Sequence, residues 1–99
     1  MLQAQIYIDK DEMKGSQLLY EFIFHFLIHH KIKGATAFRA EIGYGANQSV
    51  MRPGALFSFD ETPMMITFTD EDEKVKAVLA ELRKVFKGGL VLSLPVHTW

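Results

Sequence analysis

The sequence contains no cysteine, so disulfide bonds, thiolate nucleophiles and cysteine-ligated zinc are all excluded. It also lacks an apolar run of the ~20 residues that a membrane-spanning helix needs. The longest apolar window, residues 18–28, is interrupted by Tyr20, Glu21 and His25. The N-terminus has no basic segment of the kind that opens a secretory signal. We therefore expect a cytoplasmic protein.

An excess of charge of either sign is absent as well. The 11 basic residues nearly balance the 12 acidic ones, giving a formal net charge of -1. Non-specific binding to nucleic acid or to a membrane surface requires a basic excess, so we expect neither partner. Apolar residues, in contrast, make up 48% of the 99 residues. That supply predicts a single domain, residues 1–99, with one hydrophobic core.

Hydrophobic periodicity predicts the order strand, helix, strand, long loop, strand, helix, strand. Ser16 is a plausible N-cap for the first helix, and Asp70 with Glu73 forms a capping-box pattern for the second, which Gly88 would end. The expected strands cover residues 2–8, 34–42, 64–69 and 90–96, and the expected helices cover 17–31 and about 70–87. Right-handed crossovers then give an α+β, ferredoxin-like βαββαβ sandwich. Its four-stranded antiparallel sheet would carry both helices on one face, with the long loop between strands two and three.

The other face of this sheet has no covering element in the sequence. Tyr7, Met65 and Val91 are the apolar residues expected on it. An uncovered apolar sheet face implies a partner, most simply a second copy of the chain.

Two glycine-containing segments could hold an anion through exposed backbone N–H groups. The first is Gly43-Tyr44-Gly45, which follows a strand that carries Arg39 near its end. The second is Lys87-Gly88-Gly89, which adds a lysine to the free amides. From the residues alone ordinary backbone geometry is the favoured explanation of each segment, the first as a strand-to-loop turn and the second as a helix C-cap. Arg39 could grip a phosphate, or it could pair with a carboxylate or a neighbouring subunit.

His25 and His29 lie four residues apart on one helix face, with Glu21 one turn earlier. This spacing fits a metal site, and it fits equally the solvated stripe of an amphipathic helix. The serines have no histidine and aspartate arranged with them for nucleophilic catalysis. We find no catalytic constellation, so the sequence predicts a protein that is not an enzyme.

A family resemblance rests on these motifs and their spacing along nearly the whole chain. The sequence resembles the small PII-like family known as domain of unknown function one hundred and ninety, which is related to the PII signalling proteins and the CutA group. The matching positions are residues 34–45, then Ser58, Pro63, Asp70 and Glu73, then Gly89-Leu90. Ala40 departs from the family pattern, which has glycine there, and Thr62 replaces leucine before Pro63.

The resemblance implies a homotrimeric signalling protein that binds an adenine nucleotide, AMP, ADP or ATP, in the cleft between subunits. Gly43, Gly45, Gly88 and Gly89 would contribute backbone amides, Arg39 and Lys87 positive charge, and Tyr44 a ring that covers the base. The long loop would carry the signal, and no cofactor is required. Family members are often encoded near a predicted fluoride exporter, which implies a membrane-transport protein as partner. The alternative is a CutA-like trimer that is purely structural or binds divalent metal, with His25 and His29 as ligands.

Overall fold

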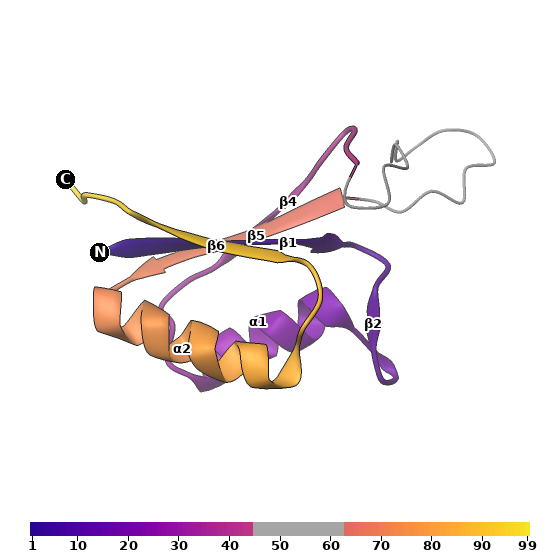
Figure 1. The fold of residues 1–99 in the computed structure, drawn as a ribbon, viewed down its shortest axis with the longest axis horizontal. Coiled ribbons are helices and arrows are strands. Elements are labelled where there is room, and N and C mark those ends of the chain that lie inside the picture. Colours follow the sequence, from indigo (N-terminus) through magenta and orange to yellow (C-terminus); the bar gives the residue numbers. More distant parts are fainter. Residues whose placement is uncertain (45–62) are drawn as a thin grey trace.

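The computed structural model describes residues 1–44 and 63–99, and Figure 1 shows the fold. A four-stranded sheet lies above two helices. The elements in chain order are β1 (Leu2–Asp9), β2 (Met13–Lys14), β3 (Gln17–Leu18), α1 (Leu19–His29), β4 (Thr36–Arg39), β5 (Pro63–Asp70), α2 (Asp72–Val85) and β6 (Leu90–Pro95). No helix in the described ranges is long and apolar enough to cross a membrane.

The main sheet has the strand order β4-β5-β1-β6, and all three of its strand pairs are antiparallel. Both helices cover the same face (Figure 1). The predicted α+β, ferredoxin-like arrangement is therefore confirmed. Strands β4 and β6 form the two outer edges, and Pro95 ends edge strand β6, where a residue that cannot donate to a neighbouring strand is tolerated.

Buried and more exposed residues alternate along β1 and β5, so every second side chain of each strand points into the core. Ile6 and Ile66 lie opposite each other at the centre, and both are fully buried. Helix α1 presents Leu19, Ile23 and Leu27 to this layer at helical spacing, as the sequence predicted. From α2 the buried residues are Val75, Val78 and Leu82.

The segment before α1 differs from the prediction. Met13–Lys14 and Gln17–Leu18 pair as a small hairpin, so Ser16 lies in its turn and is not the helix N-cap. Gly15, with φ +63°, supplies the left-handed torsion at the first turn position. The helix starts later, at Leu19, whose N–H donates to the Glu12 carbonyl at 2.8 Å. The hairpin thus satisfies a backbone donor that a capping side chain would otherwise satisfy.

The start of α2 also differs from the capping-box prediction. Asp70 is the last residue of β5, and Glu71, which makes no side-chain capping hydrogen bond, is the N-cap. Asp70 Oδ1 accepts the Glu71 N–H at 2.8 Å, while the buried Oδ2 forms an ion pair with Lys74 Nζ at 3.2 Å. Lys74 also donates to the Lys31 carbonyl after α1. This network ties the end of β5 to both helices.

We expect stability to depend on the charge of Asp70. The Glu71 N–H, followed by Lys74, holds the pKa of this carboxyl below its ordinary value of 3.8 despite its burial. The native state therefore favours the ionised form, and this stabilisation is present above pH 3.8 and lost as the pH falls through the lower, folded-state pKa. Asp70→Ala should cost about 1–3 kcal/mol at pH 7, because the Glu71 N–H and the Lys74 ammonium lose their acceptor.

Urea unfolding at pH 7 and near pH 3 measures this effect. Asp70→Asn is the matched control, because it keeps an acceptor for Glu71 and loses only the charge. The gap in unfolding free energy between the parent and Asp70→Asn should close in acid. A gap that stays constant with pH would contradict the assignment.

No element within residues 1–44 or 63–99 covers the sheet face away from the helices, which we call the open face and which carries apolar side chains beside glutamines and threonines. The register places Leu90 opposite Tyr7 and Leu92 opposite Gln5, so the β6 leucines share this face with Tyr7. Val91 lies opposite buried Ile6 and packs against the core, so its predicted place on the open face was wrong. The open-face apolar residues are Tyr7, Phe38, Met65, Leu90, Leu92 and Leu94.

Candidate functional site

The first predicted anion-binding segment lies where β4 ends. Arg39 is the last residue of β4 and faces the side opposite Phe38, because successive strand residues alternate. The Ala40 N–H donates to the Pro63 carbonyl at 2.9 Å, which joins this end of β4 to the start of β5. A Cβ at Gly43 would lie 3.4 Å from the Pro63 ring, an ordinary contact distance. Space alone therefore does not require glycine at position 43.

Two side chains of this segment are exposed, Arg39 and Tyr44. Arg39 is exposed and has no hydrogen bond or ion pair with any residue in the described parts of the chain. Tyr44 is 70% exposed. Gly45 and the tip of the loop, residues 47–49, lie outside the described residues.

The second segment, Lys87-Gly88-Gly89, joins α2 to β6. Gly89 has φ +68°, and a Cβ there would lie only 2.6 Å from the Tyr7 carbonyl oxygen. Gly89 is therefore required by the fold, whatever it binds. Arg83 Nη1 donates to the carbonyls of Phe86 at 3.2 Å and Gly88 at 2.6 Å. The helix ends at Val85, earlier than the sequence predicted.

The charges around this turn restrict where an anion can lie. The Arg83 guanidinium, which stacks 5.2 Å from the Phe86 ring, is engaged with carbonyls of the turn. A Cβ at Gly88 would be 3.5 Å from Glu12 Oε2, so a carboxylate lies beside the turn. Lys87 is exposed and forms no ion pair with a residue in ranges 1–44 or 63–99. An anion is favoured on the Lys87 and Gly89 side and repelled on the Glu12 side.

The two segments lie at the same end of the sheet but on opposite edges (Figure 1). Arg39 lies opposite Met64 on β5, Met64 lies opposite Ile8 on β1, and neighbouring Tyr7 lies opposite Leu90 on β6. The outer strands are separated by β5 and β1, which amounts to about 14 Å across the sheet. The described residues of the two segments are therefore not in contact within one chain.

The two histidines of the alternative metal site both lie on α1. His25 and His29 are both exposed. No group of three or more His, Cys, Asp or Glu side chains suited to a metal occurs in residues 1–44 or 63–99. The neighbouring His30 stacks on Phe26 at 4.1 Å, and its Nδ1 is 2.9 Å from the Phe26 carbonyl oxygen.

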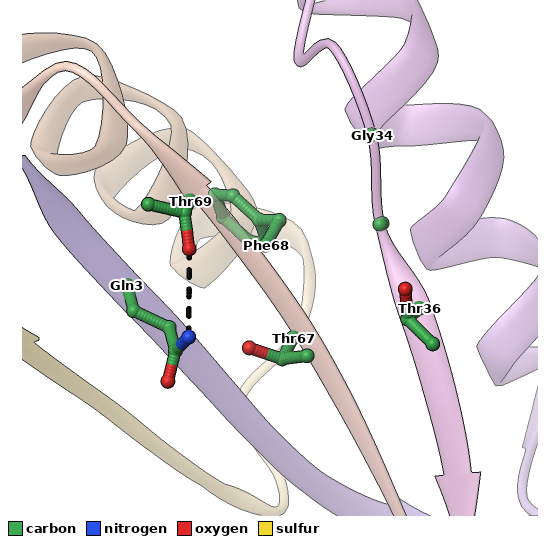
Figure 2. A pocket seen from close by; sticks show the side chains of 7 residues that line it. Gln3, Gly34, Thr36, Thr67, Phe68 and Thr69 are labelled. Carbon is green, nitrogen blue, oxygen red and sulfur yellow. Dashed lines mark hydrogen bonds between the residues drawn. The ribbon is translucent and has the colours of Figure 1, made fainter. Parts of the chain in front are cut away.

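Sequence reasoning missed an open pocket at the other end of the sheet, shown in Figure 2. It forms where the chain before β4 diverges from the end of β5. Its lining residues are Gln3, Gly34, Ala35, Thr36, Thr67, Phe68 and Thr69. The alternating threonines of β5 were visible in the sequence, but the divergence of the two strands was not.

A match to a protein-family model shows which family the chain belongs to. Residues 1–98 match the model of DUF190, described as "Uncharacterized ACR, COG1993". The chain belongs to this family. A UPF0166 protein from Aquifex aeolicus (strain VF5) is 26% identical over 89 residues, which cover 90% of this chain and 85% of that protein.

Solved structures share the fold of this DUF190 chain. CPII, a nitrogen regulatory PII-like protein from Thiomonas intermedia K12 bound to ADP, AMP and bicarbonate, aligns with a TM-score of 0.68 and 20% identity. The alignment covers 94% of this chain and 82% of CPII. A protein of unknown function from Pediococcus pentosaceus ATCC 25745 aligns with a TM-score of 0.55 and 23% identity, over 99% of this chain and 92% of that one.

Proposed function

We propose that this DUF190 protein is a PII-like regulator that binds an adenine nucleotide between copies of itself. The observation that carries the proposal is the position of the two glycine segments at one end of the sheet, on its opposite edges. When one copy places its β4 edge beside the β6 edge of the next, the segments face each other. The nucleotides named for the structurally similar CPII suggest the ligand class.

The described side chains suit the parts of a nucleotide. Arg39 and Lys87 supply positive charge for phosphate, and Arg39 can bind it bidentately. The backbone amides near Gly43 and Gly89 supply further donors. The exposed Tyr44 ring is available to stack on the base.

The proposed assembly is a homotrimer that buries the open face. Leu90 is 54% exposed and Phe38 is 53% exposed in the single chain, which is unfavourable for a free sheet surface. Covering these residues stabilises the assembly and fixes the edges that form the nucleotide cleft. The family resemblance supplies the number of subunits.

In this proposal the protein regulates and does not catalyse. The nucleotide changes the loop after β4, and a membrane-transport protein in contact with the cytoplasm reads that change. Nucleic acid has no part in the function.

Thermal unfolding with added ligand tests the proposal. AMP, ADP or ATP should raise the unfolding midpoint, because a ligand that binds only the folded state stabilises it by about 2.7 kcal/mol at one hundred times its Kd. Copper and zinc are the comparison ligands. Stabilisation by metal and by none of the three nucleotides would support the CutA-like alternative and refute the proposal.

Arg39→Ala should weaken nucleotide binding while leaving folding intact, because Arg39 is exposed and lies in the site. Loss of a charged hydrogen bond costs about 1.5–3 kcal/mol, roughly a tenfold to hundredfold rise in Kd. Isothermal titration measures it, with Lys76→Ala on α2 as the control for loss of one positive charge. Equal affinities of both variants and the parent would exclude Arg39 from the site.

A further inference from the structure

The open pocket at the far end of the sheet has a volume of about 390 Å³. A cavity of about 150 Å³ is enough to hold benzene, so this pocket has room for a larger aromatic ring. By register, Gln3 lies opposite Thr69 and Thr36 opposite Thr67, and all four belong to the open face. Figure 2 shows Thr36 and Thr67 on neighbouring strands, with the Phe68 ring next to Thr69.

The chemistry of the pocket favours a neutral group with an N–H donor. None of its described lining residues carries a charge. Thr67 Oγ1 donates to the Ala4 carbonyl at 2.9 Å, and Gln3 Nε2 donates to Thr69 Oγ1 at 3.5 Å. The Thr67 hydroxyl proton is therefore committed, and its oxygen lone pairs are available as acceptors. An aromatic ring with one N–H, such as indole, matches this arrangement.

The chain has one tryptophan, Trp99, and it is fully exposed. Trp99 follows β6 in the segment 97–99. The Val96 N–H still donates to the Met1 carbonyl at 3.0 Å, and Leu94 lies opposite Gln3 of the pocket. This segment therefore leaves the sheet at the same end as the pocket, and in Figure 1 it runs outward past β1. An isolated indole in water is an uncommon state for the side chain with the largest apolar surface.

The geometry points to the pocket of another copy. Strand β1, whose Gln3 lines one side of the pocket, lies between β6 and the lining residues on β5 and β4. Beyond Val96, three residues extend about 10 Å at most, and they run away from the sheet (Figure 1). Reaching its own pocket would require this segment to turn back across β1. A neighbouring copy that covers the open face can present its pocket without such a reversal.

We propose that Trp99 of one copy inserts its indole into the pocket of a second copy, with the indole N–H donating to a threonine hydroxyl. The contact goes beyond the proposed nucleotide site, which lies at the opposite end of the sheet. It would join the copies at a second point, next to the apolar open face.

Tryptophan fluorescence tests the contact, because Trp99 is the only source of the signal. The parent should show blue-shifted emission that is protected from acrylamide. Gly34→Leu should fill the pocket and shift the emission to that of a solvated indole. No heavy atom lies within 4 Å of a Cβ at Gly34, so the variant should fold. Ala77→Leu, on the exposed side of α2, is the control and should leave the emission unchanged.

A mixing experiment distinguishes insertion of Trp99 into a second copy from insertion into the pocket of its own chain. Gly34→Leu keeps Trp99 but has a blocked pocket, whereas Trp99→Phe has an open pocket and no tryptophan. After unfolding and refolding together, the mixture should regain the blue shift, because the indole enters the pocket of the Trp99→Phe chain. No recovery, with the parent still blue-shifted, would show docking within one chain and overturn the proposal. Solvated emission from the parent would overturn it as well. Neither readout requires a nucleotide.

Discussion

Gly89→Val is expected to destabilise the protein by about 2–5 kcal/mol, a large part of the roughly 5–15 kcal/mol typical of a domain. Two costs add together. Residue 89 has φ +68°, which a β-branched residue resists. Its Cβ would also lie 2.6 Å from the Tyr7 carbonyl oxygen, inside contact distance of backbone that cannot move alone. Ile8 and Phe86, each 3.1 Å away, leave little room for adjustment.

Urea unfolding measures the loss, and Gly34→Val is the matched control. Position 34 has open space around its Cβ and no left-handed torsion, so the same substitution should cost little there. Comparable unfolding midpoints for the two variants would contradict the role given to Gly89. The result also matters for function, because lost nucleotide binding in Gly89→Val would report a damaged fold. Arg39 and Lys87, whose side chains are exposed, are the better probes of binding.

Leu92→Glu is expected to break up the proposed homotrimer and leave a folded monomer. Leu92 lies on the open face opposite Gln5 and is 42% exposed in the single chain, so the substitution can be tolerated without a partner. In the assembly its side chain would be buried, and an unpaired carboxylate there would cost far more than the ~1.5–3 kcal/mol of the lost leucine. Light scattering at micromolar concentration measures the molecular mass.

Ile28→Glu is the control for this experiment. Ile28 is 68% exposed on α1, on the far side of the molecule from the open face. The substitution adds the same charge and removes a similar apolar group, and the variant should remain trimeric. If the parent is itself monomeric, the assembly proposal fails, and with it the nucleotide cleft. If Leu92→Glu stays trimeric, a different surface holds the copies together.

The sequence supplied the residues proposed for the candidate site, but it did not supply their relative positions. The glycine segments and Arg39 stand out locally, because glycine and charged residues at strand and helix ends are visible without any tertiary contact. Which edge each segment occupies depends on the strand order, which places β5 and β1 between β4 and β6. The pocket beside Thr67 and Thr69 arises from a divergence of strands that no local pattern encodes.

The sequence by itself determined the local periodicities, and through them the order of strands and helices. Alternation in residues 2–8 and 64–69 is a property of neighbouring residues, so these two strands were predicted from it, and each is one or two residues longer in the structure. Tertiary structure decided which face of a strand is buried. Leu92 and Val91 alternate equally well, and only the pairing of β6 with β1 places Val91 under the helices and Leu92 on the open face. A one-residue change of register would exchange them, because side chains in a strand alternate with period two.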